Sequence, residues 1–82
     1  MERRRYIMMQ QKKKIKIINC HFRNDSTDKF IFESKKARKA IKKNQTVVAF
    51  VTTEEGKVIR TSPIVSMSDK QIETKNSFYV FA

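Results

Sequence analysis

The residue types most often used in catalysis are scarce in this chain, and their spacing does not suit them to act together. The single cysteine and the single histidine, Cys20 and His21, are neighbours within residues 14–22, which have the pattern of a β-strand. Neighbouring strand side chains point to opposite faces, whereas a nucleophile and its base must be in contact. We therefore expect Cys20 to be a buried thiol and His21 to have a surface or capping role.

The acidic residues give no catalytic or metal-binding pattern either. Glu54 and Glu55 lie in a predicted turn, and Asp25 and Asp28 lie in a loop without the further ligands and the glycine of a calcium site. Structural zinc needs four Cys or His ligands, and one glycine, Gly56, excludes a glycine-rich phosphate loop. The sequence thus predicts that the protein is not an enzyme and holds no metal or cofactor.

Basic residues form the strongest pattern in the sequence. The formal net charge is +11, and it is carried by residues 1–16, at +6, and residues 33–44, at +5, while the rest of the chain is neutral. Segregated positive charge is typical of proteins that bind polyanions. The predicted binding residues are Arg3, Arg4, Arg5, Lys12, Lys13, Lys14, Lys16, Lys35, Lys36, Arg38, Lys39, Lys42 and Lys43.

Residues 34–44 are predicted to form an amphipathic helix that positions six of these cations. At about 100° per residue, the basic side chains occupy one arc and small apolar residues the other. The apolar residues are Ala37, Ala40 and Ile41. Ser34 is the predicted N-cap, and Asn44 suits the left-handed position that follows the helix.

The charges of this helix have two interpretations. Lys42 and Lys43 lie in the last turn, where the helix dipole favours cations, but Lys35 and Lys36 lie in the first turn, where it does not. A bound phosphate would compensate for these two charges. The alternatives are a solvated lysine face and an anion-binding face, and we favour the second.

The remaining elements are predicted to be short strands. Residues 24–28 and Gly56 have turn chemistry, and Pro63 implies a bulge or a sheet edge. In the first strand we expect Ile18, Cys20 and Phe22 to face the core. The predicted strands cover residues 14–22, 29–33, 46–53, 58–66, 72–74 and 78–81.

This order predicts one small α+β domain, residues 14–82, preceded by a basic N-terminal arm, residues 1–13. We expect an antiparallel β-meander of five or six short strands that curls into a partly closed SH3-like barrel, with the helix over one opening. A flat sheet backed by the helix is the alternative. No apolar run could cross a membrane, and one cysteine fits a reducing cytoplasm. Met8 or Met9 could be the true start.

The function that these patterns favour is a nucleic-acid-binding accessory protein with little sequence preference, which holds phosphates through the arm and the helix face. Lysines outnumber arginines thirteen to six, which favours attraction to the backbone over reading of bases. Phe30 and Phe32 share a strand face, as do Tyr79 and Phe81, so we expect at least one ring of each strand in the core, and we place the stacking on bases at Phe78 or Tyr79. The aromatic residues considered for stacking are Phe30, Phe32, Phe50, Phe78, Tyr79 and Phe81. DNA and RNA, and single and double strands, all remain open.

Two other hypotheses fit the same composition. The chain could be a small inhibitor or adaptor, of the phage or mobile-element type, that docks an acidic surface of a nucleic-acid enzyme. It could also be associated with the ribosome, since many ribosomal proteins are small and basic. The edge of the meander and Pro63 leave homodimerisation through a strand edge open.

Overall fold

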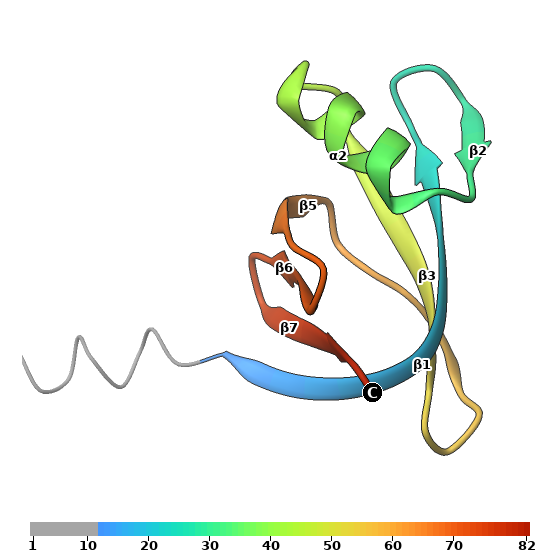
Figure 1. Cartoon of the computed structure of the whole chain (residues 1–82), viewed down its shortest axis with the longest axis vertical. Helices are drawn as coiled ribbons and strands as arrows, with labels where there is room; N and C mark the ends of the chain where they lie inside the picture. Colours follow the sequence, from blue (N-terminus) through green and yellow to red (C-terminus); the bar gives the residue numbers. More distant parts are fainter. Residues whose placement is uncertain (1–11) are drawn as a thin grey trace, which may run out of the picture.

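The structure is a computed structural model that describes residues 12–82 (Figure 1). The predicted binding residues Arg3, Arg4 and Arg5, and the alternative starts Met8 and Met9, lie outside the described residues. The elements in chain order are β1 (Lys13–Asn24), β2 (Lys29–Ile31), α2 (Ser34–Lys42), β3 (Val47–Thr53), β4 (Val58–Arg60), β5 (Ile64–Met67), β6 (Gln71–Thr74) and β7 (Ser77–Phe81). The prediction of a small α+β domain with one basic helix is confirmed for these residues.

The long strand β1 organises the sheet, whose strand order is β4-β3-β1-β7-β6-β5, with β2 also paired to β1. The first part of β1 pairs in parallel with β7, and the second part pairs antiparallel with β3 on one side and β2 on the other. Figure 1 shows β1 bending strongly between these parts, so that the β5-β6-β7 half turns toward β3 and α2. The sheet remains open between its edge strands β4 and β5, so the closure of a barrel is not found in residues 12–82.

A β-bulge in β1 decides which of its side chains face the core. The pairing of β1 with β3 shifts register between Ile17 and Asn19. Ile17 is completely buried, whereas Ile18 is 61% exposed. The extra residue inverts the alternation of faces, so that Cys20 and Phe22 point inward after the bulge as Ile17 does before it. The expectation that Ile18 faces the core is therefore wrong.

The helix α2 packs on the sheet through its small residues and ends as its sequence predicts. Ala37 is 0% exposed and Ala40 is 6% exposed, which lets the helix backbone approach the strands closely. After the helix, Asn44 adopts a left-handed conformation with φ of 62°. The amide of Asn44 donates to the Ile41 carbonyl over 3.0 Å, and the amide of Gln45 donates to the Ala40 carbonyl over 3.1 Å. This is a Schellman motif, which satisfies two carbonyls of the last turn.

The beginning of α2 differs from the prediction. Glu33, not Ser34, occupies the N-cap position, and its side chain makes no capping hydrogen bond. Ser34 is already the first helical residue, so its hydroxyl is too far along the helix to cap the first turn. That turn contains no acidic residue, so the positive end of the helix dipole coincides with Lys35 and Lys36.

Pro63 divides the predicted strand 58–66 into β4 and β5, which pair with different partners. β4 forms a hairpin with β3, and β5 pairs with β6 at the other end of the sheet. The predicted meander is confirmed for β5, β6 and β7 only. Gly56 lies in the β3–β4 turn with φ of 90°, as the turn chemistry predicts. After β4, the Thr61 hydroxyl accepts a hydrogen bond from the amide of Ala49 over 2.9 Å.

The core lies between the two halves of the bent sheet and beneath α2. No helix among residues 12–82 is long and apolar enough to cross a membrane. Tyr79 belongs to this core and is only 6% exposed, so the prediction that its ring could stack on bases is corrected. The buried apolar residues that contact one another are Ile17, Phe22, Ala37, Ala40, Val47, Ala49, Val51, Ile64, Ile72 and Tyr79.

Candidate functional site

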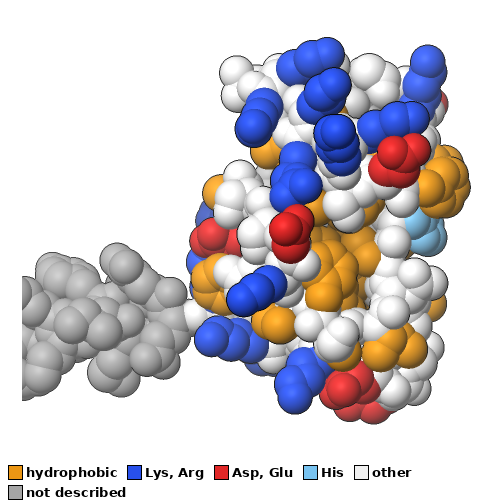
Figure 2. Space-filling view, in the orientation of Figure 1, with side chains coloured by type: hydrophobic (Ala, Val, Ile, Leu, Met, Phe, Trp, Pro, Cys, Tyr) orange, Lys and Arg blue, Asp and Glu red, His pale blue; other side chains and the backbone are white. Residues whose placement is uncertain are grey.

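The face of α2 that points away from the sheet is the most strongly basic surface among the described residues. Figure 2 shows Lys and Arg side chains gathered over the helix at the top of the view. Lys36 lies 3.5 Å from Glu33, and Arg38 lies 3.1 Å from Asp69. The other four cations are exposed and form no ion pair within residues 12–82. They are Lys35, Lys39, Lys42 and Lys43.

A hollow between α2 and β5 adjoins this basic face. It has a volume of about 250 Å³, and a second hollow beside it is lined mainly by cations of the helix. The apolar part of the wall comes from both elements, and Val65 on β5 is 59% exposed. A ligand here would meet apolar side chains and ammonium or guanidinium groups together. The residues around the first hollow are Arg38, Ile41, Lys42, Val65, Ser66 and Met67.

Lys12, one of the predicted binding residues, is engaged with the fold. Its ammonium group donates to the Glu73 carboxylate over 2.6 Å and to the Thr74 carbonyl over 2.9 Å. The hydrogen bond from Lys12, with a second one from Ser66, holds the pKa of Glu73 below its ordinary value. The same ammonium lies 5.2 Å from the centre of the Phe78 ring, so this predicted stacking ring is half-buried under a cation.

The other lysines at the start of β1 remain exposed. Lys14 and Lys16 alternate with side chains that face the core, so they lie on the outer face of the sheet, which is the surface opposite the core. Because the bulge inverts the alternation, this outer face continues along β1 to His21 and Arg23. Lys13 is also exposed. Without the bulge, the two lysines and His21 would lie on opposite faces.

An exposed aromatic cluster, formed by His21, Phe30, Phe32 and Phe50, covers the outer face of β1, β2 and β3. His21 stacks on Phe50 with ring centres 5.3 Å apart and planes at 16°, and it lies 5.8 Å from Phe32. The rings of Phe30 and Phe32 lie 6.4 Å apart at 22°. Phe30 is 52% exposed and Phe32 is 74% exposed. Figure 2 shows hydrophobic side chains beside the pale-blue histidine at the right edge.

Sequence reasoning counted Phe30, Phe32 and Phe50 among the rings considered for stacking but did not bring them together with His21. Phe30 and Phe32 share a face of the predicted strand 29–33, and the sequence led us to expect at least one of them in the core. The structure instead turns Ile31 toward the core, and both phenylalanines point outward. The alternation of Phe30, Ile31 and Phe32 was the available signal, but it did not say which face is buried.

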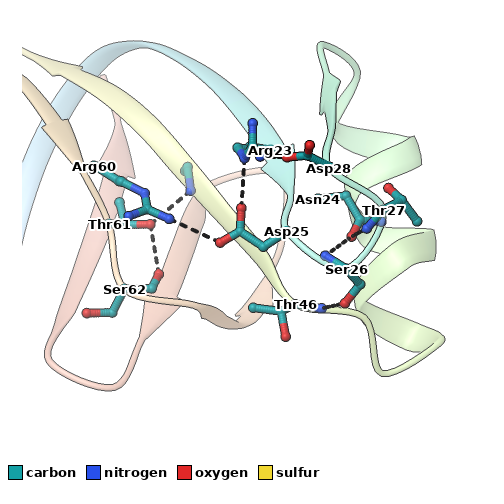
Figure 3. Close-up of polar contacts among 11 residues, drawn as sticks. Arg23, Asn24, Asp25, Ser26, Thr27, Asp28, Thr46, Arg60, Thr61 and Ser62 are labelled. Atoms are coloured by element: carbon teal, nitrogen blue, oxygen red, sulfur yellow. Dashed lines mark hydrogen bonds and ion pairs between the residues drawn. The ribbon is translucent and has the colours of Figure 1, made fainter.

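Two arginines and two aspartates form an ion-pair network next to the aromatic cluster (Figure 3). The Asp25 carboxylate accepts from Arg23 over 2.9 Å and from Arg60 over 3.1 Å. Arg23 also forms an ion pair with Asp28, and its guanidinium lies 5.5 Å from the centre of the Phe30 ring. The four charges cancel, so the network fixes Arg23 against the cluster rather than adding a free cation.

The two basic regions predicted from the sequence do not merge within residues 12–82. Figure 1 places the start of β1 and α2 at separate ends of the domain, with β5, β6 and β7 between them. Acidic residues of this intervening region hold one cation from each end, since Asp69 pairs with Arg38 and Glu73 pairs with Lys12. The described part of the N-terminal arm and the helix therefore do not form one continuous basic track.

The residues considered for catalysis are not brought together. Cys20 is partly buried, and burial raises the pKa of its thiol to about 12, so the thiol stays protonated at neutral pH. Glu54 and Glu55 are exposed in the β3–β4 turn. No group of three or more His, Cys, Asp or Glu side chains in residues 12–82 could hold a metal ion. No family model, curated protein or solved structure matches the chain.

Proposed function

We propose that this chain is a nucleic-acid-binding accessory protein held mainly by contacts to phosphates. The observation that carries the proposal is the outward face of α2, where four exposed lysines have no acidic partner within residues 12–82. Clustered lysines attract a phosphate backbone, and each contact releases counterions from it. These lysines are Lys35, Lys39, Lys42 and Lys43.

A salt titration tests this proposal. If the four lysines of α2 each neutralise one phosphate, log affinity falls against log salt with a slope of about −4 on duplex DNA and about −3 on single strands. Fluorescence anisotropy of labelled oligonucleotides, measured in steps from about 50 to 200 mM salt, gives the slope. Absence of binding at the lowest salt would contradict the proposal.

The double variant Lys35→Glu with Lys36→Glu tests the helix face itself. Negative charge is favoured in the first turn of a helix, which offsets the loss of the exposed Lys36–Glu33 ion pair, so the free energy of unfolding should stay within about 0.5 kcal/mol of that of the unmodified chain. Binding to nucleic acid should weaken at least tenfold, because two cations become anions. The matched control is Lys57→Glu with Lys75→Glu, which changes the net charge equally at exposed turns away from α2. Equal losses in both variants would mean that net charge alone drives binding.

The hollow between α2 and β5 favours a second candidate function, the docking of an acidic protein surface. Its apolar wall with cations around it suits a partner that presents apolar and acidic side chains together. A Val65→Asp variant should abolish such docking but leave the affinity for nucleic acid within about threefold. If the chain docks an acidic protein, a tagged chain used as bait should retain that partner after nuclease treatment. If the chain is instead associated with the ribosome, the same treatment should release it from ribosomal fragments.

A further inference from the structure

We propose that the aromatic cluster on the outer face of β1, β2 and β3 is a stacking platform for single-stranded nucleic acid. The proposal rests on the proposed function and deepens it by naming the class of nucleic acid. Phe30 and Phe32 are the rings that receive bases, because they are the two most exposed members of the cluster.

The exposure of these rings is the first reason. Large aromatic side chains stabilise a small domain when they are buried, yet Phe32 is 74% exposed and Phe30 is 52% exposed. They are not isolated, since both lie within about 6 Å of His21. His21 is in turn stacked on Phe50. The cluster therefore offers flat apolar rings whose positions are supported by neighbouring rings.

The cations on either side of the cluster are the second reason, and they decide which occupant fits. Lys14 and Lys16 lie on the same outer face along β1, and the five steps from Lys16 to His21 cover at most roughly 16 Å, the length of a straight strand. On the other side, Lys35 follows Phe32 by three residues in the chain and forms no ion pair within residues 12–82, whereas Lys36 lies 3.5 Å from Glu33. Exposed rings with lysines before and after them in the chain complement a strand that has stacking bases and a charged backbone.

The structure also favours a single strand over a duplex. In a duplex the faces of the bases are already stacked on each other, so only the chain ends could stack on a protein ring. In a single strand every base has a free face, and stacking on aromatic side chains is tolerant of sequence. The ion pairs of Arg23 with Asp25 and Asp28 leave little free charge at the rings themselves. A preference for a single strand over a duplex at these rings must therefore come from stacking of the bases.

The test compares Phe32→Ala with Val65→Ala, a truncation of another apolar residue, 59% exposed, on the edge strand β5 at the other end of the sheet. The probes are labelled oligothymidylate of about 15 nucleotides and a duplex of equal length. We expect Phe32→Ala to lower the affinity for the single strand roughly 5- to 150-fold, the range for one stacked base. Its duplex affinity and its salt slope should stay unchanged, and Val65→Ala should match the unmodified chain.

A direct readout is available because the chain contains no tryptophan. In the Phe32→Trp variant the new indole should bind oligothymidylate at least as tightly as Phe32 does, and its fluorescence should be quenched by the stacked base. Circular dichroism of each variant should match that of the unmodified chain, because position 32 lies at the surface.

The outcomes separate this inference from the proposed function. If the chain binds both probes and Phe32→Ala weakens neither, the platform is refuted and the phosphate-binding proposal stands. If neither probe binds at low salt, the proposed function itself fails. If Phe32→Ala dissociates a dimer in analytical ultracentrifugation without changing the affinity for the single strand, the face is a contact between two copies of the chain, and the platform is again refuted.

Discussion

Because of the bulge in β1, the same substitution should change the free energy of unfolding differently at two neighbouring isoleucines, Ile17 and Ile18. Ile17 is fully buried and Ile18 is 61% exposed. Replacing Ile17 with Val removes one buried methyl group and should lower the free energy of unfolding by about 0.5–1.5 kcal/mol. Replacing Ile18 with Val removes a methyl group that is already in water, and its effect should stay within about 0.5 kcal/mol. Valine suits a strand as well as isoleucine does, so β-propensity changes little in either case.

Urea denaturation followed by far-UV circular dichroism measures both variants against the unmodified chain. In a domain of this size, a loss of about 1 kcal/mol should also lower the melting temperature by roughly 4–8 °C. Valine is preferable to alanine at position 17, because Ile→Ala in a core costs about 2–5 kcal/mol. The total free energy of unfolding of a small domain is only about 5 kcal/mol or slightly more, so the alanine variant would be largely unfolded. A larger loss at Ile18 than at Ile17 would refute the bulge, and with it the shared face of Lys14, Lys16 and the aromatic cluster.

Three further predictions concern buried or paired polar groups. Thr61→Val removes the acceptor of the Ala49 amide and should cost about 1–3 kcal/mol in urea denaturation, whereas Thr61→Ser should retain most of that stability. Burial raises the pKa of Cys20 from 9.0 to about 12, so its thiol should react with iodoacetamide at neutral pH at least ~10-fold more slowly in the folded chain than in urea, and equal rates would contradict its burial. The pKa of Glu73 is lowered chiefly by Lys12, so its contribution to stability is present above the unfolded-state pKa and is lost as pH falls through the folded-state pKa. The melting temperature of Glu73→Gln should therefore lie below that of the unmodified chain at pH 7, and this difference should shrink on acidification. A constant difference would mean that the charge of Glu73 is not involved.

Features governed by neighbouring residues could be predicted from the sequence. The helical period of residues 34–44 gave the buried side of α2 and its basic side, because periodicity fixes which residues share a face. The left-handed conformations at Asn44 and Gly56 follow from the low steric cost of these residues there. Pro63 was expected to mark a bulge or a sheet edge, and the strands on either side of it, β4 and β5, are the two edge strands, although the single strand predicted to run through Pro63 is divided.

Features that depend on distant parts of the chain could not be predicted in this way. The bulge at Ile18 is visible only in the pairing with β3, and it decides which face of β1 carries His21. The ion pair of Lys12 joins residues at opposite ends of the described chain, so Lys12 looked like a free cation in the sequence. The aromatic cluster needs both the pairing of three strands and the orientation of β2, which short-range patterns do not determine.

The parallel pairing of β1 with β7 has a consequence for how the chain reaches its native state. Residues 13–17 find their neighbours among residues 77–81, so the sheet cannot be completed on the ribosome until nearly all of the domain has emerged. Contacts between such distant segments make folding slow. A fragment that ends before residue 77 would expose the backbone amides and carbonyls along the first part of β1, which is a template for aggregation. Any truncated product of this chain should therefore be sought in the insoluble fraction.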